Sequence, residues 1–583
     1  MLRTVVLYAF VVIGFLFFCL PVHAEQYIVS DSNELDKAVK AALPGDTIVM
    51  KNGTWKDALI RLNGNSGEPG KEITLRAETG GKVLLTGTSR LRIGKDYWVV
   101  DGLRFQDGGL PNTSYGGIVE FRDGSGKHAN HSRLTNTQII GYNPPSKDTD
   151  YKWVSLFGTH NRVDHSHFEG KNHAGALLVV WRYGDTDKDR DYHQIDYNYF
   201  GKIPVFGKNG AEAIRIGTSE YSRGASNTIV ESNLFEEANG EAEIISVKSW
   251  ENIIRYNTLR NSQGGIVLRH GDNSEVYGNY ILGGNLCNTV GIRIIGYGHK
   301  VYNNYISGIG CSYKPLSAAI ILMNGDPKYN EDPSRGELVL HTYKQARYAE
   351  IVHNTLVNNK NNVHIGVGSE GYNVPPDSIT IANNVIYGTT APLINLLSKP
   401  TNMTYKGNVM FGAGLGITPV PEGIVMQDPA VAMSGDGLFR PSAASPVKDQ
   451  AQGSFPYVDK DMDGQSRDGA KDVGADELSA SKPERAPLTR GQVGPSWLEA
   501  PPAAAPAASS ASTAAVQASA SAASANSTAP AAGLAASGSP QATTEASGGS
   551  GGYTMYMASA GVVLAGVLVW GIGRGRRRKG RGA

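Results

Sequence analysis

An asparagine recurs at a nearly regular interval along this 583-residue chain, each time in the pattern apolar-x-x-Asn-x-apolar. Successive asparagines of this series lie 24, 22, 25, 50, 30 and 24 residues apart, and the longest interval is about two periods. The series consists of Asn233, Asn257, Asn279, Asn304, Asn354, Asn384 and Asn408. A period of this length, with alternating apolar residues and no helical heptads, predicts stacked coils of short strands. We therefore predict an all-β fold, a right-handed parallel β-helix, whose inward asparagines satisfy backbone groups at a bend rather than take part in catalysis.

The extent of the repeat sets the limits of the predicted domain. Looser copies occur upstream and the pattern fades after about residue 440, so we assign residues 25–440 to the β-helix. Residues 32–42 form an amphipathic pattern capped by Ser32 or Asn33, which predicts a short helix covering the N-terminal end of the solenoid. We expect residues 441–499 to form a closing coil and a C-terminal extension. A calcium loop at the Asp-x-Asp-x-Asp-Gly run there is disfavoured, because Ala470 stands where such a loop needs glutamate.

Both ends of the chain carry targeting or anchoring patterns. Residues 1–24 combine Arg3 with an apolar run and a small residue before the expected cut, which predicts a signal peptide, with a membrane anchor as the alternative. Residues 500–552 are almost wholly Ala, Ser, Pro, Thr and Gly, which predicts a disordered linker. Residues 553–573 predict a transmembrane helix or a processed sorting signal, and residues 574–583 a basic cytoplasmic tail. We therefore expect a location in the bacterial cell envelope, on the periplasmic or extracellular face, either tethered or released after processing.

The net charge bears on the expected partners, and the cysteines bear on a possible link between coils. The net charge is +1, so no global attraction to nucleic acid is expected, and we expect a monomer. Cys287 and Cys311 are the two cysteines outside the predicted signal peptide, and they lie 24 residues apart, which is close to one coil. A disulfide between adjacent coils and a pair of buried thiols both remain open.

Basic residues gather on one predicted face of the solenoid. Aligning Ile245-Ser-Val-Lys248 with Ile266-Val-Leu-Arg269 places Lys248 and Arg269 in one column, about 4.8 Å apart on neighbouring coils. The same alternation turns Arg215 and Arg293 outward. Such a face suits an acidic polysaccharide, although a solvated charged face is the simpler alternative.

Acidic residues precede the same strands. Glu241 and Glu243 stand just before Lys248, and Asn209 precedes the strand of the previous coil. Three oxygen ligands from adjacent coils could hold a hard cation such as Ca²⁺, with water molecules completing the coordination.

The order of these motifs resembles polysaccharide lyase family 6, which includes alginate lyases and the chondroitinase B type. The motifs are Asn209-Gly210, Ile214-Arg-Ile-Gly217, Glu241-x-Glu243-x-x-x-x-Lys248-Ser249 and Arg269-His270-Gly271, and the resemblance extends over residues 26–440. It implies that Lys248 is the Brønsted base and Arg269 the acid, with Ca²⁺ held by Asn209, Glu241 and Glu243. Candidate substrate contacts are His270, Arg215 and Arg182.

The resemblance implies a lyase that cleaves a uronate-containing anionic polysaccharide, most often alginate, by calcium-assisted β-elimination. In that reaction the base removes the C5 proton of a uronate, and the cation neutralises the carboxylate so that negative charge can develop. The alternatives are a glycosaminoglycan lyase acting on dermatan or chondroitin, a uronate C5-epimerase, and an inactive glycan-binding β-helix. Hydrolysis is disfavoured, because it needs paired carboxylates in acid and base roles where this face has a Lys–Arg pair.

Overall fold

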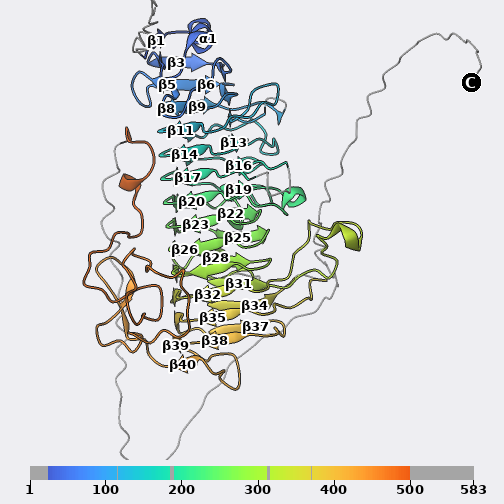
Figure 1. The fold of residues 1–583 in the computed structure, drawn as a ribbon, viewed down its shortest axis with the longest axis vertical. Helices are drawn as coiled ribbons and strands as arrows, with labels where there is room; N and C mark the ends of the chain where they lie inside the picture. The colour runs from blue at the N-terminus through green and yellow to red at the C-terminus, as the bar shows by residue number, and fades with distance from the viewer. Residues whose placement is uncertain (1–23, 114–115, 184–189, 312–314, 369–370, 499–583) are drawn as a thin grey trace, which may run out of the picture. The chain divides into compact units, whose positions relative to one another are not determined.

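The computed structural model describes residues 24–113, 116–183, 190–311, 315–368 and 371–498. These residues form a right-handed parallel β-helix, in which each coil contributes strands to three parallel sheets that run the length of the stack (Figure 1). The chain passes from sheet A to sheet B to sheet C and then enters the next coil. The predicted fold class is confirmed.

The three sheets contain nearly all of the strands. Sheet A has fourteen: β1 (Gln26–Val29), β2 (Thr47–Met50), β5 (Ile73–Ala77), β8 (Trp98–Asp101), β11 (Arg133–Thr135), β14 (Arg162–Asp164), β17 (Gln194–Asp196), β20 (Ile229–Glu231), β23 (Ile253–Arg255), β26 (Glu275–Tyr277), β29 (Lys300–Tyr302), β32 (Glu350–Val352), β35 (Thr380–Ala382) and β38 (Thr404–Lys406). Sheet B has fourteen: β3 (Gly53–Lys56), β6 (Val83–Gly87), β9 (Leu103–Gly108), β12 (Gln138–Ile140), β15 (His167–Glu169), β18 (Tyr199–Phe200), β21 (Leu234–Glu236), β24 (Thr258–Arg260), β27 (Tyr280–Leu282), β30 (Tyr305–Ser307), β33 (Thr355–Val357), β36 (Val385–Tyr387), β39 (Asn408–Phe411) and β40 (Ile424–Met426). Sheet C has twelve: β4 (Leu59–Leu62), β7 (Arg90–Ile93), β10 (Val119–Glu120), β13 (Val154–Leu156), β16 (Leu178–Val180), β19 (Ile214–Ile216), β22 (Glu243–Lys248), β25 (Gly264–His270), β28 (Thr289–Ile294), β31 (Ile320–Met323), β34 (Val363–Val367) and β37 (Ile394–Leu396).

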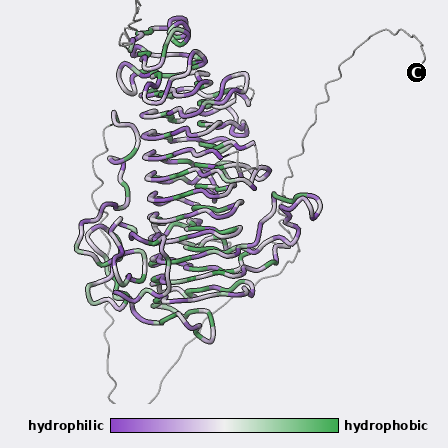
Figure 2. The backbone as a smooth tube through the Cα atoms, viewed as in Figure 1, coloured by the Kyte–Doolittle hydropathy of each residue, from purple (hydrophilic) through white to green (hydrophobic). Residues whose placement is uncertain are grey.

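Alternating side chains from all three sheets fill the interior of the coils. The inward Ile, Val, Leu and Phe residues form one continuous buried cluster from Val29 to Ile424. Apolar positions accordingly recur in coil after coil along the stack (Figure 2). Because each coil buries its apolar side chains mainly against its two neighbours, the core has the stacked form expected of a solenoid.

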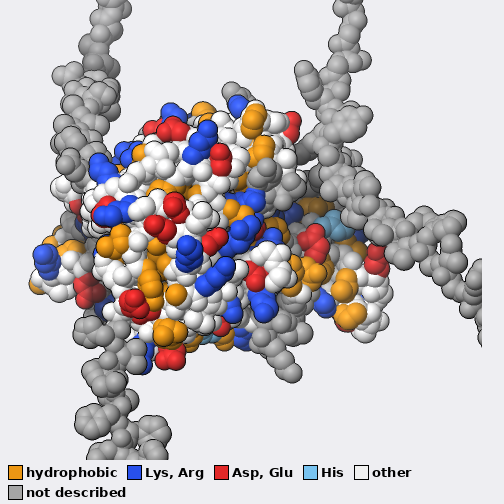
Figure 3. Space-filling model, turned by 90° about the horizontal axis from the view of Figure 1, so that it is seen from above, with side chains coloured by type: hydrophobic (Ala, Val, Ile, Leu, Met, Phe, Trp, Pro, Cys, Tyr) orange, Lys and Arg blue, Asp and Glu red, His pale blue; other side chains and the backbone are white. Residues whose placement is uncertain are grey.

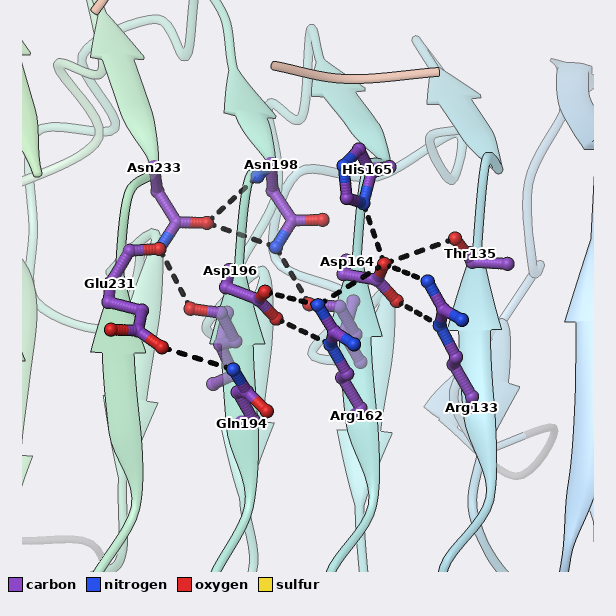
Figure 4. A network of polar contacts seen from close by, with 12 residues as sticks. Arg133, Thr135, Arg162, Asp164, His165, Gln194, Asp196, Asn198, Glu231 and Asn233 are labelled. Atoms are coloured by element: carbon purple, nitrogen blue, oxygen red, sulfur yellow. Dashed lines mark hydrogen bonds and ion pairs between the residues drawn. The ribbon is translucent and has the colours of Figure 1, made fainter. Parts of the chain in front are cut away.

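The recurring asparagines form a hydrogen-bonded ladder at the bend between sheets A and B. Each side-chain amide up to Asn384 donates to the side-chain oxygen of the next asparagine along, as Asn233 does to Asn257 and Asn257 to Asn279, both at 3.0 Å. Figure 4 shows the preceding step, from Asn198 to Asn233. The residue before each asparagine adopts a positive φ, such as 57° at Tyr256, which makes the tight bend. The predicted structural role of these asparagines is confirmed.

Replacing Asn257 with alanine is expected to lower the free energy of unfolding by about 3 kcal/mol. The side chain is fully buried, donates to the carbonyl of Val230 and accepts the backbone N–H of Asn233, so its loss leaves buried polar groups without partners. Urea denaturation would measure the change, with the exposed Asn52 changed to alanine as a control that should shift stability by less than about 0.5 kcal/mol. Equal stability of the two variants would contradict the role of the ladder.

A short helix, α1 (Ser32–Ala41), covers the N-terminal end of the core as predicted. Its N-cap is Asp31 rather than Ser32 or Asn33, because the Asp31 carboxylate accepts the backbone N–H groups of Asn33 and Glu34 at 2.8 and 2.9 Å. The helix buries an apolar face formed by Leu35, Ala38 and Val39. Figure 3 looks onto this end of the solenoid and shows charged side chains of both signs across it.

Cys287 and Cys311 form a disulfide, with their Cα atoms 4.3 Å apart. Cys287 follows β27, and Cys311 occupies a similar position one coil later, after β30. The two residues therefore link adjacent coils, which decides between the two alternatives left open by the sequence.

For residues 441–499 we predicted a closing coil and a C-terminal extension; residues 441–498 add no strand to the three solenoid sheets and run back along the outside of the β-helix. The three solenoid sheets end at β38, β40 and β37, and a separate antiparallel pair follows, formed by β41 (Val431–Met433) and β42 (Phe439–Pro441). The extension lies beside the coils, in orange and red in Figure 1. Phe455 packs with Tyr302 on the outer face of sheet A, and the indole of Trp497 donates to the carbonyl of Asn136 at 2.8 Å. The reason for this course is that large apolar side chains on the outer faces of sheets A and B need cover.

The contact between the extension and sheet A is expected to weaken in acid through His353. Asn383 donates to Nε2 of this buried imidazole, and Nδ1 lies 3.1 Å from the carbonyl of Asp472 in the extension. Burial, with the charges of Arg467 and Lys471, holds the pKa of His353 well below its ordinary value. The folded protein therefore binds fewer protons than the unfolded chain. The stabilisation is complete above the unfolded pKa of about 6.5 and is lost as the pH falls below it, by about 2 kcal/mol at pH 5.

Urea denaturation between pH 7 and pH 5 would test this contribution. Replacing His353 with glutamine keeps a polar side chain that does not titrate, so the fall in the free energy of unfolding should be smaller by about 2 kcal/mol. An identical fall in both proteins would show that His353 does not contribute.

No helix in the described part of the chain is both long enough and apolar enough to cross a membrane. The predicted membrane tether in the cell envelope is therefore not supported, and we do not retain it. The predicted linker, apolar segment and basic tail, and residues 1–23 of the predicted signal peptide, lie outside the described residues.

Candidate active site

The candidate site lies on the outer face of sheet C, where β19, β22 and β25 are neighbours. Arg215, Ser246, Val267 and Arg293 occupy one column of register partners across four consecutive coils. Inward residues on either side of this column, such as Ile245 and Val247, belong to the core. The rigid core therefore fixes the positions of the outward side chains.

Lys248 pairs with His270 and not, as predicted, with Arg269. The register shifts between Val247 and Lys248, so that Arg269 is an extra residue in β25. Such a β-bulge places two residues opposite one and redirects their side chains. As a result Arg269 and His270 lie beside each other next to Lys248, and Arg269 donates from Nη1 to Nε2 of His270 at 3.0 Å.

Three glutamates from two consecutive coils meet beside Lys248. Oxygen atoms of Glu212, Glu241 and Glu243 lie within 4.8 Å of one another. Glu241 and Glu243 were expected here, whereas Glu212 was missed. A signal for it was present in the sequence, because Glu212 stands two residues before Ile214 just as Glu243 stands two residues before its register partner Ile245.

Glu241 and Glu243 experience different electrostatic environments. Burial and the nearby charges of Glu212 and Glu243 raise the pKa of Glu241 to about 9. Burial alone would also raise the pKa of Glu243, but the positive charges of Arg293 and Arg269 hold it below its ordinary value. Glu243 also forms an ion pair with Arg293 and accepts the Ser246 hydroxyl at 2.6 Å.

The three-glutamate group offers oxygen ligands that suit a hard divalent cation. Oε1 of Glu241 and Oε2 of Glu212 are buried and have no hydrogen-bond partner among the residues that the structure describes. Buried oxygens of this kind are costly unless a proton or a cation satisfies them, and oxygen-only ligand sets suit Ca²⁺. Asn209, the third predicted ligand, is exposed in the adjoining loop, and the backbone N–H of Gly210 donates to Oε2 of Glu241 at 3.1 Å.

Lys248 and Arg269 lie close to different members of this group. Nζ of Lys248 is 3.9 Å from Oε1 of Glu212, and Nε of Arg269 is 3.9 Å from Oε1 of Glu243. The guanidinium of Arg269 also lies over the ring of Tyr343, 4.1 Å from its centroid. Tyr343 comes from the loop between β31 and β32, which is anchored by the buried ion pair of Lys344 with Asp272.

Two predicted substrate contacts, His270 and Arg182, are buried in the structure. His270 is 1% exposed, and burial with the charges of Arg269 and Lys248 holds its pKa well below the ordinary value. Its neutral ring therefore accepts from Arg269 and orients it. The side chain of Arg182 is fully buried, where it forms an ion pair with Asp191 and donates to the carbonyl of Ala225. Neither side chain is available to a polymer, whereas the partly exposed Arg215 is.

A family model, described as Chondroitinase B, matches residues 29–453. The chain belongs to polysaccharide lyase family 6. It is 34% identical to the PL6 family alginate lyase AlyGC, with a TM-score of 0.66 over 75% of this chain and 60% of AlyGC. It is also 32% identical to a mannuronic acid specific family 6 lyase from human gut microbiota, with a TM-score of 0.61 over 70% of this chain and 92% of that one. Pedsa3628, a PL6 family lyase from Pseudopedobacter saltans, is 28% identical, with a TM-score of 0.59 over 81% of this chain and 99% of that one.

The family 6 protein matches no curated protein sequence. It spans about three fifths of the length of AlyGC. The resemblance drawn from the motifs around Lys248 and Arg269 is thus confirmed at the level of the family.

Proposed function

We propose that this family 6 protein is a polysaccharide lyase that cleaves a uronate-containing polysaccharide by β-elimination. The observation that carries the proposal is that Lys248 and Arg269 each lie 3.9 Å from a different carboxylate of one three-glutamate group. A base, an acid and a cation-binding group on one open sheet face are what this elimination needs.

Each residue of the site has a role in this proposal. Lys248 removes the C5 proton, and Arg269, held by His270 and Tyr343, faces the O4 atom that leaves. Glu212, Glu241 and Glu243 would hold Ca²⁺ together with Asn209 from the adjoining loop. When bound, the ion supplies Lewis-acid neutralisation of the uronate carboxylate. Arg215, on the neighbouring strand β19, would pair with the carboxylate of an adjacent uronate.

Alginate is the substrate that we propose. Support comes from the relatives described as an alginate lyase and as a mannuronic acid specific lyase, at 34% and 32% identity. Dermatan is the second candidate, because the matching family model is described as Chondroitinase B.

Incubating the full chain with poly-mannuronate, poly-guluronate and dermatan sulfate, each with Ca²⁺, would test the proposal. The new C4–C5 double bond of the product absorbs ultraviolet light, so elimination is followed directly. We expect absorbance to rise with an alginate polymer. No rise with any of the three polymers would overturn the lyase assignment, and a rise with dermatan sulfate alone would replace alginate by the second candidate.

A further inference from the structure

A second cationic site lies on the outer face of sheet C, towards its N-terminal end. Arg61 of β4, Arg90 and Arg92 of β7, and Arg122 after β10 line a cavity of about 550 Å³. The strand order β22-β19-β16-β13-β10-β7 places β7 five coil spacings from the strand that carries Lys248. At about 4.8 Å for each spacing, the two sites are about 24 Å apart on the same face.

Among the described residues that line this cavity, positive charges outnumber negative ones. Four guanidinium groups share it with the carboxylates of Glu120 and Asp123. Glu120 is buried and forms ion pairs with both Arg92 and Arg122. Burial and the like charges of the neighbouring arginines lower the pKa of Arg92 to about 10. A further anion would relieve this repulsion, and guanidinium groups bind carboxylates in a planar, two-bond geometry.

A row of rings and arginines leads from this cavity towards the catalytic side chains. Glu120, Ser155, Val179, Arg215 and Ser246 are successive register partners, so the residues two positions later form a parallel column that reaches Lys248. That column begins with Arg122, Phe157 and Trp181.

Ring and guanidinium contacts run from Arg122 along this column to Trp181 and then to Arg215 of the neighbouring column. The guanidinium of Arg122 lies 4.1 Å from the ring centroid of Phe157, which stacks on Trp181 at 6.0 Å, and Arg215 lies 5.6 Å from Trp181. Tyr183 stacks over Phe157 and is 54% exposed, so its ring is accessible to a sugar. The exposed ring of Tyr183 and the arginines at both ends of this row suit a chain of anionic sugars.

We propose that the cavity around Arg61, Arg92 and Arg122 is a distal subsite that binds a uronate carboxylate of a polymer running along sheet C. A pyranose in an extended 1,4-linked chain is about as long as one coil spacing, so a chain cleaved beside Lys248 reaches the cavity about four or five sugars away. The subsite therefore makes the protein prefer long chains over trimers. This inference rests on the proposed lyase function.

The test compares kcat/KM for a long polyuronate with kcat/KM for a uronate trimer, which is too short to span the two sites. Arg61 is exposed and can be changed without removing the buried Glu120 pair. Arg61→Ala is expected to lower kcat/KM for the polymer about 5-fold, through KM, with the trimer unchanged. Arg61→Lys should recover part of the loss, and Arg76→Ala, on sheet A in the same part of the stack, should change neither value.

A binding measurement separates this inference from the proposed function. Titrating polyuronate into Lys248→Ala and into Lys248→Ala/Arg61→Ala requires no turnover, and the second protein should bind about 5-fold more weakly at low salt, with the difference shrinking in high salt. Equal affinities, or equal losses of kcat/KM for polymer and trimer, would overturn the distal subsite while leaving the lyase assignment intact. A wild-type protein that binds the polymer but produces no unsaturated ends would overturn the lyase assignment alone.

Discussion

Changing Lys248 to alanine is expected to lower kcat on the polysaccharide by about 1,000-fold, because general-base catalysis contributes factors of this size. Nζ of Lys248 lies 3.9 Å from Oε1 of Glu212, beside the three-glutamate group. The side chain stands on the outer face of sheet C, outside the core of the coils. Its loss should therefore leave the fold and the thermal midpoint nearly unchanged.

Two further variants separate the role of Lys248 as a base from its positive charge and from the loss of a lysine elsewhere on the surface. Lys248→Arg keeps the positive charge beside Glu212 but supplies no base at working pH, so it should be as inactive as Lys248→Ala. Lys300→Ala removes a lysine from the outer face of sheet A, where it pairs with Glu275, and should retain full activity. Formation of unsaturated ends gives the rate, and thermal unfolding gives the stability. If Lys248→Arg kept most of the activity, the role of the residue would be electrostatic and the assignment as base would fail.

The solenoid was predictable because a single local rule repeats. Each asparagine such as Asn257 must lie at a bend and face its counterpart one coil away, so a period near 24 residues determines which strands are neighbours. Alternation then assigns inward and outward positions. These two periodicities place Arg215 and the glutamates on one face without any knowledge of side-chain packing.

The details of the site depended on exceptions to that rule. The extra residue in β25 is a feature of one pair of strands, and it moves His270 rather than Arg269 opposite Lys248. Burial of His270 and Arg182 depends on what covers them, which periodicity does not determine. The course of residues 441–498 was missed for a related reason, since the extension has no repeat and is positioned by rings that the outer sheet faces leave uncovered.

Removing divalent cations with a chelator is expected to lower kcat/KM by more than about 100-fold, and Ca²⁺ should restore it. The structural reason is the proximity of Glu212, Glu241 and Glu243, whose oxygens lie within 4.8 Å of one another. Without a cation, Glu241 resists ionisation, as its pKa of about 9 indicates. A ligand that binds only the folded protein also stabilises it, so Ca²⁺ should raise the thermal midpoint of the chelated protein.

Glu241→Gln distinguishes a cation site from an acidic cluster that serves only structure. In chelator the variant should be at least as stable as the wild-type protein, because the amide resembles the protonated carboxyl that burial already favours. In Ca²⁺ it should lose most of the stabilisation and require a Ca²⁺ concentration at least about 10-fold higher for activity, since one charged ligand is gone. Glu237→Gln, an exposed residue that pairs with Lys202, should behave as wild type under both conditions. If Ca²⁺ stabilised Glu241→Gln as strongly as wild type, the three glutamates would not be the ligands. The carboxylates would then have to act through Lys248 and Arg269 alone.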